Sequence, residues 1–150
     1  MEGKYFSKEN IYLDVEGTTF EEILKNVNTS LVQRGKVKES FYEAVLEREK
    51  TFPTGLEFPG YNIAIPHTDS VHVNTNSIVV VKPKNPIVFR DMGTNSKELE
   101  VKVLLLLLIS KNEDQVTVLS GIIKQFADAE CYQNILESSS EEEIYNIITK

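Results

Sequence analysis

The feature that most constrains the fold is an almost unbroken apolar run at residues 101–109, VKVLLLLLI. A strand with one face in water alternates apolar and polar side chains, whereas a strand covered on both faces does not. Residues 77–81, SIVVV, show the same lack of alternation. We therefore expect two interior strands in a sheet that carries helices above and below it.

Helical and extended patterns interleave with these two strands. Further strands are expected at 11–15 and 61–65, with a weaker one near an edge at 86–89. The expected helices run from the capping box of Thr19 with Glu22 to Gly35, from about Lys38 to Lys50, from Glu113 to Ala127, and onward from SSSEEE. The apolar face of the third is expected to comprise Val116, Leu119, Ile122, Ile123 and Phe126. The pattern predicts one α/β domain over 1–150, with a central mixed, partly parallel sheet and helices on both faces.

The charge balance excludes one large class of partners. The chain has 16 basic and 23 acidic residues, a formal net charge of −7, which opposes the phosphate neutralisation that dominates nucleic-acid affinity. We expect no nucleic-acid partner. The apolar run 103–109 is far shorter than the roughly 20 residues of a membrane helix, and the N-terminus MEGKYFSKEN has no signal-peptide pattern. These features favour a cytoplasmic protein without an inserted segment.

A histidine directly follows the proline that ends the YNIAI strand. Pro66 lacks a backbone donor, so His67 is the first side chain beyond the strand, where open α/β sheets gather their ligand chemistry. A neutral imidazole is a nucleophile, and either Asp69 or a backbone carbonyl can fix its second nitrogen. Thr68 and the turn N–H groups can bind an anion on the ring. A loop histidine without chemistry is the alternative interpretation.

Other site chemistries are disfavoured. His72 could join His67 and Asp69 in a metal site, but this spacing matches no strong metal motif, so we expect no metal. Cys131 is the only cysteine, which excludes an internal disulfide and a cysteine cluster for zinc. The chain has no G-x-S-x-G elbow and no histidine near Cys131 in sequence, which argues against a hydrolase.

Two neighbouring segments, EREKTFPTGLEF and YNIAIPHTD, resemble the IIA components of the sugar phosphotransferase system, in the fructose–mannitol superfamily. The joint pattern, R-E-x-x-[FY]-P-T-G-[IL] followed by [AI]-x-A-I-P-H, is more specific than either half. The segments DSVHV and VVVKPKNPIVF are most similar to the galactitol-specific branch. The resemblance runs from about Leu13 to Ile148 and implies a type 2 IIA domain.

This resemblance implies a phosphocarrier that needs no metal or organic cofactor. His67 matches the family's phosphorylated histidine, which receives a phosphoryl group from phospho-HPr and passes it to a cysteine of a IIB component. IIB then phosphorylates a sugar or polyol while the membrane component IIC transports it. Arg48 matches the family's arginine, and its planar guanidinium suits phosphoryl oxygens. An exposed arginine paired with Glu43, Glu47 or Glu49 is the alternative.

The resemblance also singles out two further positions. Thr54 lies in the turn between the helix of Arg48 and the YNIAI strand. We favour a role in shaping that turn, and the alternative is that its hydroxyl donates to the phosphoryl group. Several family members carry a second active-site histidine where this chain has Gln115, which can donate a hydrogen bond but cannot carry a proton. Assistance to transfer would then come from Gln115 itself, from His72 or from Arg48.

Two other functions stay open at this point. A regulatory module would use the phosphorylation state of His67 to control a partner protein. A fold relative such as the cytoplasmic domain of an anion exchanger would lack phosphoryl chemistry, which the intact AIPH sequence disfavours. For a carrier we expect weak, fast docking and sugar specificity in the membrane component. Phe52, Leu56 and Phe58 are candidates for the apolar surround of His67, and a place in the core is the equal alternative for each.

Overall fold

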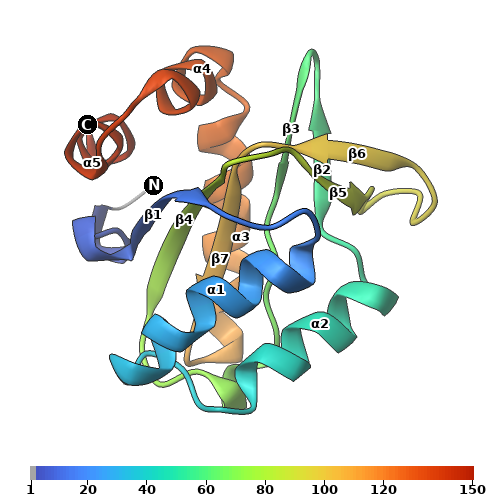
Figure 1. The fold of residues 1–150 in the computed structure, drawn as a ribbon, viewed down its shortest axis with the longest axis vertical. Coiled ribbons are helices and arrows are strands. Elements are labelled where there is room, and N and C mark those ends of the chain that lie inside the picture. Colours follow the sequence, from blue (N-terminus) through green and yellow to red (C-terminus); the bar gives the residue numbers. More distant parts are fainter. Residues whose placement is uncertain (1–2) are drawn as a thin grey trace.

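Figure 1 shows the computed structural model of the protein, which describes residues 3–150. Five strands form a central sheet in the order β1-β4-β7-β3-β2. The pairs β1–β4 and β3–β7 are parallel, whereas β4–β7 and β2–β3 are antiparallel. The strands are β1 (Ile11–Val15), β2 (Gly55–Phe58), β3 (Tyr61–Ala64), β4 (Ser77–Pro83) and β7 (Leu104–Leu108). The expected mixed sheet is confirmed.

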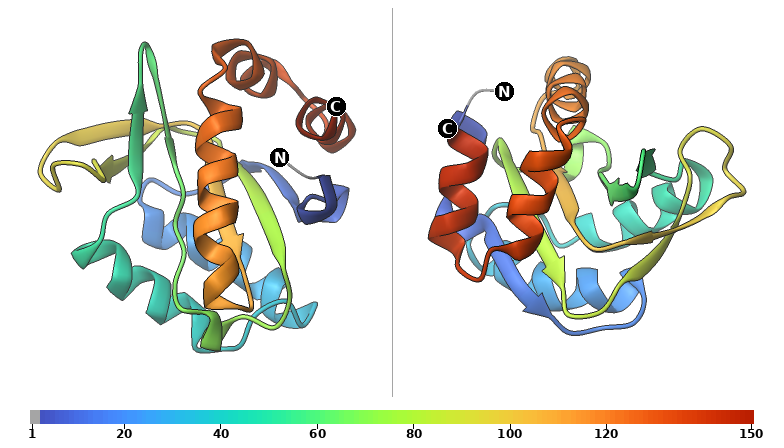
Figure 2. Two further views of the ribbon diagram at one scale, coloured as in Figure 1. Left: turned by 180° about the vertical axis from the view of Figure 1, so that it is seen from behind. Right: turned by 90° about the horizontal axis from the view of Figure 1, so that it is seen from above.

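Helices cover both faces of this sheet (Figure 2). One face carries α1 (Phe20–Gln33) and α2 (Phe41–Thr51), and the other carries α3 (Asn112–Phe126), α4 (Ala129–Glu137) and α5 (Glu141–Thr149). Three short 3-10 helices are η1 (Gly3–Tyr5), η2 (Lys8–Asn10) and η3 (Ser70–His72). Within residues 3–150, no helix has the length and apolar character needed to cross a membrane.

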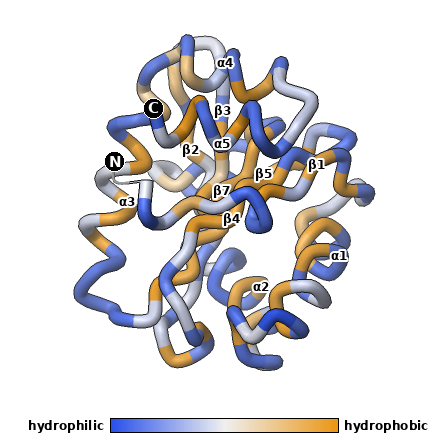
Figure 3. The backbone as a smooth tube through the Cα atoms, turned by 90° about the vertical axis from the view of Figure 1, so that its left-hand side faces the viewer, coloured by the Kyte–Doolittle hydropathy of each residue, from blue (hydrophilic) through white to orange (hydrophobic). Residues whose placement is uncertain are grey.

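The two central strands show why their sequences lack alternation. In β4, Val79 and Val81 pack into the core under α1 and α2, whereas Ile78 and Val80 pack into the core under α3, α4 and α5. The residues of β7 alternate between the same two cores, and all of them are buried. Figure 3 shows the hydrophobic residues concentrated along both strands at the centre of the molecule. Burial on both faces therefore requires apolar residues at successive positions.

A second, two-stranded sheet lies beside the central one. It pairs β5 (Ile87–Arg90) antiparallel with β6 (Glu98–Val101). The strand expected at 86–89 is present, but it pairs with β6 and does not join the central sheet. The single strand expected over 101–109 is wrong at its start. Val101 ends β6, and the chain bends at 102–103 before β7 begins, so one apolar run serves two sheets.

The helix starts follow local capping rules. At α1, the Thr19 hydroxyl oxygen accepts the Glu22 N–H at 3.2 Å, as expected. The Glu22 carboxylate accepts the N–H of Thr18 at 2.8 Å, so the reciprocal half of the box lies one residue earlier. At α5, Ser140 caps the helix by accepting the N–H of Glu143 at 3.2 Å. These contacts satisfy backbone donors that the helices leave free.

Three local features differ from expectation. β2, which pairs with β3, and α4, which Asp128 caps, were not expected. On α3 the inward placement of Val116 is wrong, because that side chain is 71% exposed and Val118 is buried instead. Val116 lies in the first turn of α3, next to Gln115, whose side chain bonds to the loop after β3. The helix buries its apolar residues only from Val118 onward.

We predict that Gly55, where the two sheets touch, tolerates no side chain. A Cβ there would lie 2.6 Å from the carbonyl oxygen of Arg90, and the Gly55 carbonyl accepts the Met92 N–H at 2.7 Å. Gly55→Ala should lower the free energy of unfolding, measured in urea, by about 1–3 kcal/mol. Gly93→Ala is the matched control, since its Cβ would meet only Asp91 Oδ2, at 3.4 Å. Equal losses in the two variants would contradict this explanation.

Candidate functional site

The segment that follows β3 is held in place from both sides. The N–H of Ile65 donates to the Thr54 carbonyl at 3.2 Å, and the Pro66 carbonyl accepts the N–H of Leu107 at 3.1 Å. The proline has no donor of its own, so the ladder ends there. His67 is the next residue and is half-buried. As expected, His67 is thus the first residue beyond this hydrogen-bonded segment.

One hydrogen bond sets the state of the His67 ring. Its Nδ1 lies 2.9 Å from the carbonyl oxygen of Ile65. A carbonyl oxygen can only accept, so Nδ1 carries the proton and donates it. In the neutral ring, Nε2 therefore holds the free lone pair. Of the two partners considered from the sequence, Asp69 or a backbone carbonyl, the structure uses the carbonyl.

The surroundings of His67 keep the ring neutral. Burial lowers the pKa of His67 below its ordinary value of 6.5, and the hydrogen bond to Ile65 acts in the opposite direction. The Arg48 guanidinium lowers the pKa further, whereas the Asp69 carboxylate raises it. The net shift is downward, so the ring is uncharged at neutral pH and Nε2 is available as a nucleophile.

Arg48 lies at the surface beside this histidine. It belongs to the last turn of α2, and its Nη1 is 3.8 Å from Oδ1 of Asp69. The guanidinium carbon also lies 5.1 Å from the centre of the Phe52 ring. Two of the three glutamates considered as alternative partners have other contacts: Glu47 pairs with Lys50, and Glu49 accepts from Thr54. The structure therefore brings Arg48 to the loop that carries His67.

The first turn of α3 is attached to the same loop. Gln115 Nε2 donates to the carbonyl oxygen of Thr68 at 2.9 Å, and the Ser70 N–H donates to Asn112 Oδ1 at 3.1 Å. Thr68 itself is buried. The amide of Gln115 thus holds the backbone one residue beyond His67, which is a task that needs no proton transfer.

Two expected residues have partners of their own. His72 Nδ1 lies 2.8 Å from the hydroxyl of Ser40, at the start of α2. The Thr54 hydroxyl donates to Glu49 Oε1 at 2.8 Å and is buried. Across the described part of the chain, no three His, Cys, Asp or Glu side chains lie together as a metal site would require.

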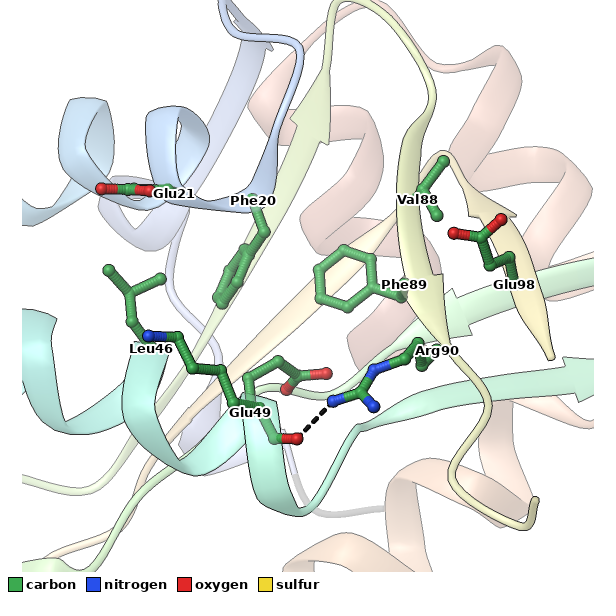
Figure 4. A pocket seen from close by; sticks show the side chains of 9 residues that line it. Phe20, Glu21, Leu46, Glu49, Val88, Phe89, Arg90 and Glu98 are labelled. Atoms are coloured by element: carbon green, nitrogen blue, oxygen red, sulfur yellow. Dashed lines mark hydrogen bonds between the residues drawn. The ribbon is translucent and has the colours of Figure 1, made fainter. Parts of the chain in front are cut away.

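Glu49 was not singled out from the sequence, yet it is the ionisable group with the largest change in this region. Burial raises its pKa to about 7, against the opposing effects of the two Thr54 hydrogen bonds and of Arg90. Glu49 and Arg90 line a cavity of about 400 Å³ between α1, α2 and the two-stranded sheet (Figure 4), whereas His67 does not line it. In sequence, Glu49 resembles its solvated neighbours on α2.

We predict opposite responses of the His67 pKa to changes in its two charged neighbours. Arg48→Gln removes a positive charge and should raise the pKa, whereas Asp69→Asn removes a negative charge and should lower it. NMR titration of the ring protons measures both shifts. Glu47→Gln, a substitution of an exposed glutamate on the same helix, should change neither. Shifts in the same direction for Arg48→Gln and Asp69→Asn would contradict this electrostatic account.

The chain is similar in sequence to proteins of the sugar phosphotransferase system. Residues 4–150 match the family described as phosphoenolpyruvate-dependent sugar phosphotransferase system, EIIA 2. The galactitol-specific EIIA component of the phosphotransferase system of Escherichia coli K12 is 22% identical over 115 residues, which are 77% of this chain and 76% of that protein. The family inferred from the two motifs is thereby confirmed.

Solved structures of such proteins share the fold. The complex of enzyme IIA and phosphorylated enzyme IIB for mannitol from Escherichia coli matches with a TM-score of 0.77 at 20% identity, over 95% of this chain and 96% of that one. The nitrogen regulatory protein IIA-Ntr from Neisseria meningitidis matches with a TM-score of 0.76 at 22% identity, over 98% of each chain. From its motifs, its fold and the match over residues 4–150, the chain belongs to the EIIA 2 family of the phosphoenolpyruvate-dependent sugar phosphotransferase system.

Proposed function

We propose that this chain accepts a phosphoryl group on His67 from phospho-HPr and passes it to a cysteine of a IIB component during uptake of a galactitol-type polyol or sugar. The observation that carries the proposal is the hydrogen bond between His67 Nδ1 and the Ile65 carbonyl, because it leaves Nε2 as the free nucleophile. The galactitol-specific relative supports the substrate class, and the solved IIA–IIB complex supports the partner.

The proposed transfer has two balanced steps. In the first, the Nε2 lone pair attacks phosphorus, and the bond between phosphorus and its HPr donor breaks as the new N–P bond forms. In the second, the sulfur of the IIB cysteine attacks phosphorus, and the N–P bond breaks. The proton stays on Nδ1 throughout, donated in a hydrogen bond to the Ile65 carbonyl, so the same ring serves as nucleophile and then as leaving group.

Arg48 is proposed to steady the phosphoryl oxygens. Its pair with Asp69 is 3.8 Å long and partly solvated, and exposed pairs of this kind contribute about 0–1 kcal/mol. A phosphoryl group with two negative charges competes well for such a guanidinium. Gln115 is proposed to position the loop through the Thr68 carbonyl. It would not take over the chemistry of a second histidine.

Exposed apolar side chains around His67 support a docking surface for protein partners. Phe52, Val71 and Val116 are all exposed, and we call these three residues the docking surface. They lie at the end of α2, on η3 and near the start of α3, which are the elements that approach the His67 loop. Leu56 and Phe58 are partly buried and pack against the core, which was the alternative for both residues, so we leave them out of the docking surface.

The first test follows label from phosphoenolpyruvate through enzyme I and HPr to this protein. The chain has two histidines, so His67→Gln and His72→Gln form a matched pair. The native chain and His72→Gln should take up acid-labile label, whereas His67→Gln should take up none. Label that persists in His67→Gln would refute the assignment of the nucleophile.

The second test concerns the docking surface. Val71→Lys and Val116→Lys should each reduce the rate of phosphoryl transfer from dilute phospho-HPr by about tenfold, which corresponds to about 1.4 kcal/mol of lost contact. Val88→Lys is the matched control, since Val88 is also exposed but lies on β5 in the two-stranded sheet. An equal loss in Val88→Lys would show that the effect is not specific to the His67 face.

A further inference from the structure

Glu49 has an unusual place for a carboxylate next to Arg48. Its neighbours Glu47 and Lys50 pair with each other at the surface of α2, whereas Glu49 turns toward the chain that follows the helix. There it accepts the Thr54 N–H on Oε2 and the Thr54 hydroxyl on Oε1, each at 2.8 Å. Thr54 is 3% exposed. One carboxylate therefore fixes both the backbone and the side chain of a buried residue.

Thr54 is in turn connected to the histidine. Its carbonyl oxygen accepts the N–H of Ile65 at 3.2 Å. The carbonyl oxygen of Ile65 accepts the Nδ1 proton of His67 at 2.9 Å. Four residues, from Glu49 in α2 through Thr54 and Ile65 to the His67 ring, are thus joined by a continuous series of hydrogen bonds. A shift of Thr54 moves the Ile65 peptide, and with it the acceptor that selects the tautomer of His67.

We propose that Glu49 is a positioning residue for phosphoryl transfer, holding the His67 ring in its Nδ1-protonated form through Thr54 and Ile65. This inference rests on the proposed function of His67 as the phosphoryl acceptor. Glu49 itself does not touch the phosphoryl group. Its effect is to keep Nε2 directed outward with its lone pair free.

The burial of Glu49 makes this hold sensitive to pH. Burial raises the pKa of Glu49 to about 7, against the lowering effects of the two Thr54 hydrogen bonds and of Arg90 on β5. Glu21 from α1 and Glu98 from β6 line the same cavity (Figure 4). Lys50 from α2 also lines it. A protonated carboxyl has one oxygen that donates, so it can no longer accept both Thr54 hydrogen bonds. The hold on Thr54 weakens as the pH falls through about 7.

The test uses the full chain and phosphoramidate, a small phosphoryl donor that loses ammonia when Nε2 attacks its phosphorus. Because no HPr is needed, failure of the carrier function and failure of this inference are distinguishable. The rate of His67 phosphorylation is followed by phosphorus NMR as a function of pH. Native protein should show two ionisations, one from His67 below pH 6.5 and one from Glu49 near pH 7.

Glu49→Gln should react about tenfold more slowly at alkaline pH, and its profile should lack the ionisation near pH 7. Thr54→Val, which loses the hydroxyl bond, should also slow the reaction, whereas Thr54→Ser should keep most of the native rate. Glu47→Gln is the control and should behave as native, because Glu47 is exposed and pairs with Lys50 at the surface. The Thr54 pair decides the matter if Glu49→Gln does not fold.

Nitrogen NMR of the His67 ring supplies a readout that a purely structural role would not change. In native protein the Nδ1-protonated tautomer should dominate, and in Glu49→Gln and Thr54→Val the Nε2-protonated form should appear. The proposal is overturned if these variants keep the native tautomer, or if Glu49→Gln retains the ionisation near pH 7. A chain that reacts with phosphoramidate but takes no label from phospho-HPr would instead count against the carrier function.

Discussion

The antiparallel pairing of β4 with β7 is the contact on which the rest of the structure depends. Ser77–Val81 pairs residue by residue with Leu104–Leu108, and all of these residues are buried. Each face of the pair meets a different group of helices, so the pair fixes both helical layers relative to each other. β3 lies beside β7, and the Leu107 N–H donates to the Pro66 carbonyl, which holds the segment before His67 against β7. Hydrophobic burial in the middle of the sheet therefore decides where His67 stands.

The candidate site places a neutral histidine, His67, close to the cation of Arg48. A positive charge attracts phosphoryl oxygens, but a protonated ring beside it would have no free lone pair to attack phosphorus. Here burial and Arg48 both disfavour the imidazolium, and a backbone carbonyl orients the neutral ring. Asp69 partly offsets Arg48 from the solvent side. The balance is achieved with groups from α2 and the His67 loop, two segments that only the tertiary fold brings together.

The sequence predicted those parts of the fold that depend on local rules. Proline ended a strand before His67, and unalternating strands required helices on both faces. The pairing of Arg48 with Asp69 was not predicted, because it joins residues 21 positions apart and depends on how α2 packs. Glu49 was missed because a glutamate between Arg48 and Lys50 has the pattern of a solvated helix face. Only the fold shows that it accepts from Thr54. The sequence does carry a start signal for α4, the capping residue Asp128. The helix has only nine residues, however, so its apolar positions show too little periodicity to predict it.

The ion pair between Arg48 and Asp69 has a further consequence for how partners tell the two states of a carrier apart. An arginine that turns to a phosphoryl group on His67 leaves Asp69, whose side chain is 69% exposed, without its counter-charge. Phosphorylation of His67 would then alter the surface at two points, the phosphoryl group itself and the newly unpaired carboxylate of Asp69. The phosphoryl donor, which binds before transfer, and the IIB acceptor, which binds after it, would therefore meet surfaces with different charge patterns. Phosphorylation of the His67 nitrogen would thus change the charge that a partner meets at Asp69.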